Sequence, residues 1–251
     1  MLDSSVVSQQ PWAASTNDDL LSPEIANQVL RRALGGRGHF AEIYAEERVS
    51  AAISTDGGHI ERVTSGLQRG AGIRVAASES IGMAFTESLE ASAMLAAADA
   101  ARDAALGIGR PHAAVAGSRA PTSSPVMSFK NATNAQRVEL VLRGDQAAWA
   151  ADPRIQQVTV FLGTIQQRIV VANSEGLYRV DRRPRLRYRV QVVARGAGEK
   201  LGLGTYAPGV TRGFDFLEQV SPETIATTAV SQALAQLEAG PAPAPPGSWC
   251  R

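Results

Sequence analysis

The feature that most constrains this chain is a pair of short apolar runs with glycine in each, at residues 70–75 and 81–86. The small and polar residues 76–80 separate them, a length that joins antiparallel strands. The two runs therefore predict a β-hairpin. Glycine packs poorly in a strand and usually marks a bulge or a close backbone neighbour. We expect these glycines to serve close packing more than ligand binding.

The residues on either side of the hairpin predict one α+β domain over residues 22–109. Ser22, Pro23 and Glu24 begin a helix, because serine caps free amides and proline suits the first turn. Alternation from Phe40, a turn at 56–58 and a second strand from His59 to about residue 64 come next. The alanine-rich stretch 88–106 predicts another helix.

The second half of the chain predicts a second α+β domain over residues 132–239. The connector 110–131 contains three prolines and is the expected domain boundary. A helix at 135–151 and a terminal helix opening with Ser221-Pro222-Glu223 enclose four predicted strands, 155–162, 166–172, 176–180 and 185–194, and a glycine-rich mobile loop, 196–213.

The predicted fold class is thus α+β, with antiparallel sheets and flanking helices in two domains. The ends of the chain are expected to lie outside this core. Residues 1–21 show no clear period and are interpreted as a loosely ordered lead-in. The proline-rich residues 240–251 are interpreted as an extended linker that is cut short.

Composition excludes several classes of function. The 251 residues carry 25 basic and 24 acidic side chains, and a net charge of +1 predicts no general attraction to nucleic acid or to a membrane surface. The sole cysteine, Cys250, excludes an intrachain disulfide and a zinc site built on cysteines. Because no apolar run reaches signal-peptide or membrane length, we expect a cytoplasmic protein.

The residues themselves predict no catalytic and no metal-binding site. His39, His59 and His112 form no His-Glu-x-x-His pair. His59 and Glu61 share a strand face, but we interpret them as a residue near a turn and a solvated carboxylate. The chain has no Gly-x-Ser-x-Gly motif, and the glycine run lacks the third glycine of a dinucleotide-binding loop.

Two sets of arginines remain open to interpretation. Arg74, between Ile73 and Val75, either extends to the surface or anchors a carboxylate or carbonyl of a peptide or partner. A second set alternates in part with apolar residues and is expected on one strand face. We interpret this face as solvated, and nucleic-acid binding by it is the less favoured alternative. The set consists of Arg179, Arg182, Arg183, Arg185, Arg187 and Arg189.

Several runs, in order and spacing, resemble the TldD branch of the TldD/PmbA family of zinc metallopeptidases, formerly called modulators of DNA gyrase. They are residues 70–75 with 82–86, 151–158 and 171–176. The resemblance extends from about residue 22 to 238 and implies the family's first two domains. It makes Gly70, Gly72 and Gly82 part of a structural signature.

The resemblance further implies a TldE/PmbA-like partner in a heterodimer and unfolded or small peptides as substrates. In the family, zinc is bound by a His-Glu-x-x-x-His motif and a cysteine in a third, C-terminal domain. Because this motif is absent from residues 1–251, we expect a truncated, non-catalytic portion with no cofactor of its own. The alternative is a stand-alone module that binds peptides or a protein, and nucleic-acid binding is the weakest hypothesis.

Overall fold

The computed structural model describes residues 20–107 and 132–240. Most of the predicted lead-in, the whole predicted connector at 110–131, His112 and Cys250 lie outside them. The described elements, in chain order, are α1 (Pro23–Leu34), β1 (Phe40–Asp56), β2 (His59–Ala77), β3 (Ser80–Thr86), α2 (Ala91–Ala105), α3 (Asn134–Ala151), β4 (Ile155–Asn173), β5 (Tyr178–Arg195), β6 (Leu201–Tyr206), β7 (Gly209–Val210), α4 (Phe216–Gln219) and α5 (Pro222–Glu238), with a short 3-10 turn, η2, at Ala197–Glu199.

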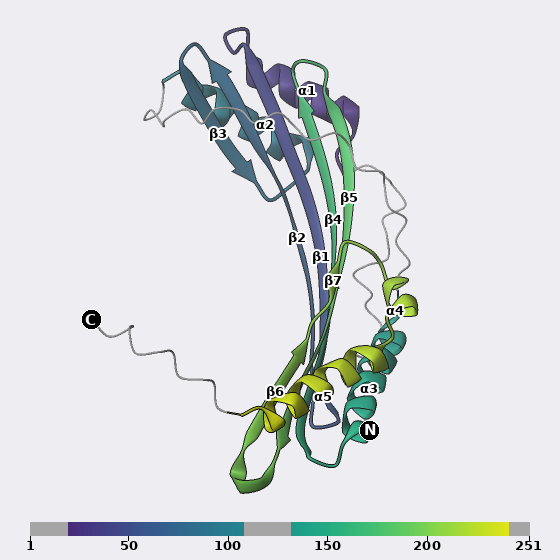
Figure 1. Cartoon of the computed structure of the whole chain (residues 1–251). Coiled ribbons are helices and arrows are strands. Elements are labelled where there is room, and N and C mark those ends of the chain that lie inside the picture. Colours follow the sequence, from purple (N-terminus) through teal and green to yellow (C-terminus); the bar gives the residue numbers. More distant parts are fainter. Residues whose placement is uncertain (1–19, 108–131, 241–251) are drawn as a thin grey trace, which may run out of the picture. The chain divides into compact units, whose positions relative to one another are not determined.

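The strands form a seven-stranded sheet in the order β3-β2-β1-β4-β5-β6, with β7 beside β5 (Figure 1). The hairpins β2–β3 and β5–β6 are antiparallel. Backbone hydrogen bonds also pair β1 with β4 in opposite directions, from Ser174 to Ala41 and from Gly57 to Val158. The predicted α+β class with antiparallel strands and flanking helices is confirmed.

Three predicted breaks between strands are wrong, because the strands continue through them. β2 runs without a break to the hairpin, β4 continues through Gly163 and Thr164, and β5 continues through residues 182–184. At Gly163 and Thr164 strands on both sides of β4 supply partners for the backbone, and at the other two breaks β1 and β4 do so on one side. This pairing outweighs local turn propensity. At Gly163 the Phe161 ring lies where a Cβ would be, so an aromatic side chain covers the glycine.

The prediction of a mobile loop at 196–213 is also wrong, because these residues include strands β6 and β7. Its glycines have a packing role. A Cβ built at Gly202 would overlap the carbonyl oxygen of Ala233, and one at Gly204 would overlap that of Ala229. Glycine thus lets the backbone of α5 lie directly against β6.

The two helix starts predicted from a Ser-Pro-Glu run are confirmed. The Ser22 hydroxyl accepts a hydrogen bond from the Ile25 amide at 3.3 Å, and that of Ser221 accepts one from the Thr224 amide at 3.2 Å. Each satisfies an amide that the first helical turn leaves without a partner. α1 ends where predicted, at Gly35, whose φ of 48° is left-handed.

The described residues fall into two compact units. One takes its described residues from within Met1–Ala51, Ser65–Phe129 and Thr164–Arg185, and the other takes its described residues from within Ala52–Thr64, Lys130–Gly163 and Leu186–Arg251. The core of the first unit lies between its strands and helices α1 and α2. Its fully buried side chains include Val29, Ile43, Ile73, Val75 and Met94.

The predicted hairpin is confirmed, with a turn of only two residues, 78–79. Its register pairs Ile73 with Ala84 and Val75 with Gly82. Gly82 faces α2, where an added Cβ would overlap the Ala101 carbonyl oxygen and the Ala105 amide nitrogen. The backbones of β3 and α2 therefore touch at this glycine.

We expect Gly82→Ala to destabilise the first unit by about 2 kcal/mol or more, because helix α2 must move away from the strand. Gly72→Ala is the matched control. Its Cβ would meet only the Phe85 ring, at 3.0 Å, and an exposed side chain can move. Urea unfolding of both variants measures the difference, and equal losses would contradict the packing role of Gly82.

Candidate functional site

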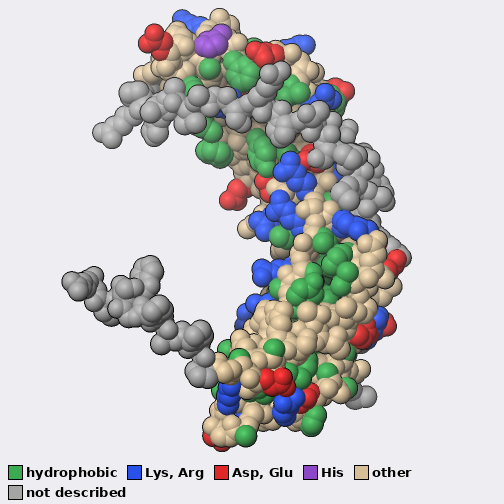
Figure 2. All heavy atoms as spheres, in the orientation of Figure 1, with side chains coloured by type: hydrophobic (Ala, Val, Ile, Leu, Met, Phe, Trp, Pro, Cys, Tyr) green, Lys and Arg blue, Asp and Glu red, His purple; other side chains and the backbone are tan. Residues whose placement is uncertain are grey.

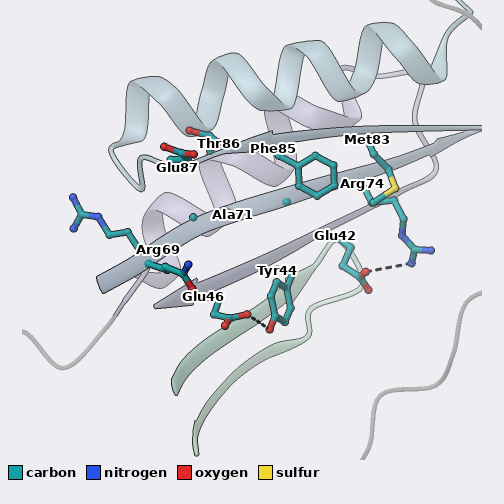
Figure 3. Close-up of a pocket in the computed structure, with 13 residues that line it drawn as sticks. Glu42, Tyr44, Glu46, Arg69, Ala71, Arg74, Met83, Phe85, Thr86 and Glu87 are labelled. Atoms are coloured by element: carbon teal, nitrogen blue, oxygen red, sulfur yellow. Dashed lines mark hydrogen bonds and ion pairs between the residues drawn. The ribbon is translucent and has the colours of Figure 1, made fainter. Parts of the chain in front are cut away.

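A hollow of about 730 Å³ lies on the face of the first unit's strands that is opposite helices α1 and α2 (Figure 3). Alternation along the strands explains its position. Ala71, Ile73 and Val75 are buried toward the helices, so the side chains between them point the other way. The hollow is lined by residues from β1, β2 and β3, among them Glu42, Tyr44, Gly72, Arg74, Met83 and Phe85.

Arg74 projects over this face and is held by two neighbours. Its Nη2 lies 3.3 Å from Oε1 of Glu42, and its guanidinium carbon lies 5.6 Å from the centre of the Phe40 ring. Its Nε is buried and has no hydrogen-bond partner among the described residues. The guanidinium is therefore held by these two neighbours while its Nε donor stays unpaired. A buried donor without a partner lowers the stability of the folded protein.

Tyr44 and Glu46 form a second polar pair at the hollow (Figure 3). The Tyr44 hydroxyl donates a hydrogen bond of 2.7 Å to Oε2 of Glu46. Partial burial, and then this hydrogen bond to a carboxylate, raise the pKa of Tyr44 to about 12. The phenol therefore stays protonated at neutral pH, and its hydrogen-bond donor is already used.

The glycines predicted as a structural signature lie on both sides of the sheet. Gly70 and Gly72 line the hollow, and the Phe85 ring lies beside Gly72. Gly82 is on the helix side and lines no part of it. Phe85 is 75% exposed and Met83 is 55% exposed, so the hollow has an uncovered apolar wall.

Sequence reasoning missed most residues of the hollow other than Arg74 and the glycines. Glu42, Tyr44 and Glu46 alternate in the sequence, so their common strand face was predictable. The position of β1 beside β2 follows from the sheet order, which those residues do not reveal. Phe85 and Met83 read as ordinary strand residues, and only their exposure distinguishes them.

The second unit carries a smaller hollow of about 360 Å³ between α3 and the residues around α4. Arg143 lies at it and forms a two-pronged ion pair with Glu223, with distances of 2.7 and 3.0 Å. This pair lowers the pKa of Glu223 to about 2. Both charges are thus already matched, which leaves little for a ligand to bind.

The arginine set on β5 alternates as predicted over part of its length. Leu186, Tyr188 and Val190 are buried, whereas Arg185 and Arg187 are exposed. Other members have partners: Arg183 pairs with Asp181 at 2.6 Å, and Arg189 lies over the Phe161 ring. Figure 2 shows basic side chains interspersed with acidic and hydrophobic ones on the visible face.

The described residues do not fit a zinc site. Nowhere within 20–107 and 132–240 do three or more His, Cys, Asp or Glu side chains gather closely enough to hold a metal ion. Glu61, which shares a strand face with His59, accepts a hydrogen bond from the Ser54 hydroxyl at 3.3 Å. The same part of the chain contains no helix with the length and apolar character needed to cross a bilayer.

Comparison with solved structures shows the same fold in three proteins. A protein from Thermotoga maritima described as a modulator of a DNA gyrase aligns with a TM-score of 0.70 at 16% identity, over 88% of this chain and 49% of its own. A modulator of DNA gyrase from Bacteroides thetaiotaomicron gives 0.65 at 14%, over 84% and 49%. TldE from Thermococcus kodakarensis gives 0.59 at 14%, over 85% and 47%.

Sequence comparison gives the family. The chain is 23% identical to a metalloprotease TldD homolog of Haemophilus influenzae, over 82% of this chain and 44% of that protein. For the Buchnera aphidicola homolog the identity is 23%, over 64% and 34%. The chain thus spans less than half the length of these relatives. Residues 41–105 match the PmbA/TldA metallopeptidase domain 1 and residues 128–237 the central domain, so the chain belongs to the PmbA/TldD metallopeptidase family.

Proposed function

We propose that this chain forms the first two domains, residues 22–109 and 132–239, of a TldD-like metallopeptidase that acts on peptides. The observation that carries the proposal is the match to the family's domain 1 and central domain in that order. The likeness to proteins named TldD homologs favours the TldD branch. We further propose a TldE/PmbA-like partner and a cytoplasmic location.

In this proposal the hydrolytic chemistry belongs to zinc held outside residues 1–251. Fast amide hydrolysis at neutral pH needs an activated water, which zinc supplies by lowering the pKa of that water. The described residues do not fit a zinc site, so no step of hydrolysis is assigned to them. Their role is to bind the partner and to shape the space that a peptide enters.

The hollow over β1, β2 and β3 is the proposed contact surface of the first unit. Its apolar wall, formed by Phe85 and Met83, can pack against a side chain of a peptide or partner. The Arg74 side chain is 25% exposed, and the exposed part of its guanidinium can bind a carbonyl or carboxylate. We assign Arg74 the role of a binding residue, not a catalytic one.

A second candidate function is a stand-alone module that binds peptides or a protein. The exposure of Phe85 and Met83 favours it, because that surface needs no zinc to bind an apolar partner. Nucleic-acid binding has less support. The net charge is +1, and Arg183 and Arg189 already have partners.

The first test is hydrolysis. We expect the purified 251-residue chain, with added zinc, to leave an unstructured peptide uncut, and to bind a TldE/PmbA-like protein from the same genome. Mass spectrometry of the peptide and co-purification of the two proteins measure these outcomes. Cleavage that a chelator abolishes would overturn the assignment of the chemistry, whereas absence of partner binding would favour the stand-alone module.

The second test concerns Arg74. We expect Arg74→Ala to weaken binding of the TldE/PmbA-like protein by about tenfold or more, because a hydrogen bond to a charged group contributes about 1.5–3 kcal/mol. Arg69→Ala is the matched control, since Arg69 also lines the hollow but its side chain extends away from it (Figure 3). Calorimetric titration of both folded variants decides. Unchanged affinity in Arg74→Ala would reduce this arginine to a structural role.

A further inference from the structure

The strand order of the sheet ends in β3 on one side and in β6 on the other, and a helix seals the outer edge of β6. On β6, the amides of Leu203 and Thr205 point away from β5. The Leu203 amide donates to Oε1 of Gln236 at 2.8 Å, and the Thr205 amide donates to Oε1 of Gln232 at 3.1 Å. Both glutamines belong to α5. The α5 side chains therefore occupy donors that another strand would need.

The register of the other hairpin shows which groups of β3 point outward. The Ala76 carbonyl accepts a hydrogen bond from the His39 amide, on the side of β2 that faces away from β3. Successive residues of a strand direct their backbone groups to opposite sides, so Ala77 and every second residue before it pair with β3. Their partners in β3 are Ser80, Gly82, Ala84 and Thr86. The amides and carbonyls of the alternate residues point to the open edge; these are Ile81, Met83 and Phe85.

No described side chain covers this edge as the glutamines cover β6. Helix α2 packs on β3 through Gly82, as α5 packs on β6 through Gly204. Three residues after the contacting Ala229, α5 carries Gln232. At the corresponding place, three residues after the contacting Ala101, α2 carries Ala104. The side chain of alanine has no acceptor, so at this position α2 offers no side-chain partner to an outward amide of β3.

We propose that the open edge of β3 binds an extended segment of another protein as an additional strand. The backbone groups of Ile81, Met83 and Phe85 define the occupant as a strand, because only an extended chain matches an alternating row of donors and acceptors. Its residues opposite these three place their side chains on the face that carries Phe85 and Met83. We therefore expect apolar residues at every second position of the segment.

Charge at the two ends of β3 favours a different chain over a second copy. Glu79 and Glu87 are exposed and lie four residues to either side of Met83. If two copies paired antiparallel about Met83, Glu79 of each, in the turn before β3, would come near Glu87 of the other, directly after β3. Like charges directly opposite one another destabilise a strand pair. A segment with basic residues eight positions apart would instead match both carboxylates.

This inference rests on the contact surface of the proposed function, but it requires no zinc and no cleavage, so its test can fail while the assignment to a metallopeptidase stands. The probe is a capped nine-residue peptide, acetyl-Lys-Thr-Val-Thr-Val-Thr-Val-Thr-Lys-amide, whose valines would face Met83 and Phe85 in antiparallel pairing. Added to the full chain, it is expected to slow hydrogen exchange of the Ile81, Met83 and Phe85 amides in NMR spectra. A peptide with glutamate in place of both lysines is expected to bind about fivefold more weakly or worse.

Met83→Pro and Met83→Ala form the matched pair of variants. Proline removes the outward amide of residue 83 and leaves the hydrogen bonds between β2 and β3 in place, as an edge strand permits. Alanine removes the same side chain and keeps the amide. We expect the proline variant to bind the probe about tenfold or more weakly than the alanine variant does, because it lacks one backbone hydrogen bond to the probe.

Three results would overturn the proposal. One is probe binding without protection of the three amides, and another is equal affinity of the two variants. The third is a concentration-dependent dimer, seen by sedimentation without peptide, in which the same amides are protected, because the occupant would then be a second copy. Circular dichroism shows whether the proline variant folds, and the exchange measurement on the unaltered chain does not depend on it.

Discussion

The packing of both edge strands depends on contact between helix and strand backbones at glycine. Gly82 brings β3 against α2, and Gly202 with Gly204 brings β6 against α5. A side chain at any of these positions would overlap backbone atoms of the helix, which cannot move without the rest of the helix. The position of each helix over its edge strand follows from these contacts.

The same contacts determine what each edge can do. Once α5 lies close to β6, Gln232 and Gln236 reach the outward amides and close the edge. Helix α2 is equally close to β3, but it is rich in alanine and offers no acceptor there. The hollow with Arg74 lies on the opposite face of the strands beside this open edge, so the first unit offers backbone groups and side chains to a partner.

The sequence predicted the features that depend on local chemistry. Capping by Ser22 and Ser221, the left-handed Gly35 and the β2–β3 hairpin follow from side-chain preferences over a few residues. The alternation that buries Tyr188 was also readable, because strand periodicity is a local property.

Features that depend on partners distant in sequence were not predictable. β4 passes through Gly163 because neighbouring strands hold it, and β6 exists because α5 covers its glycines. The hollow combines Glu42 of β1 with Arg74 of β2, and no pattern in either run reveals that the two side chains meet. The family resemblance supplied the domains without supplying these contacts.

The most direct test of this account is native-state hydrogen exchange of the free chain, residue by residue. The amides of Leu203 and Thr205 donate to side chains of α5. The account predicts that they exchange at least about tenfold more slowly than the amides of Met83 and Phe85. The reason is that each of these hydrogen bonds stabilises the closed state by roughly 1 kcal/mol or more. Equal protection of the amides at the two edges would contradict the claim that α5 seals β6 while the edge of β3 stays open.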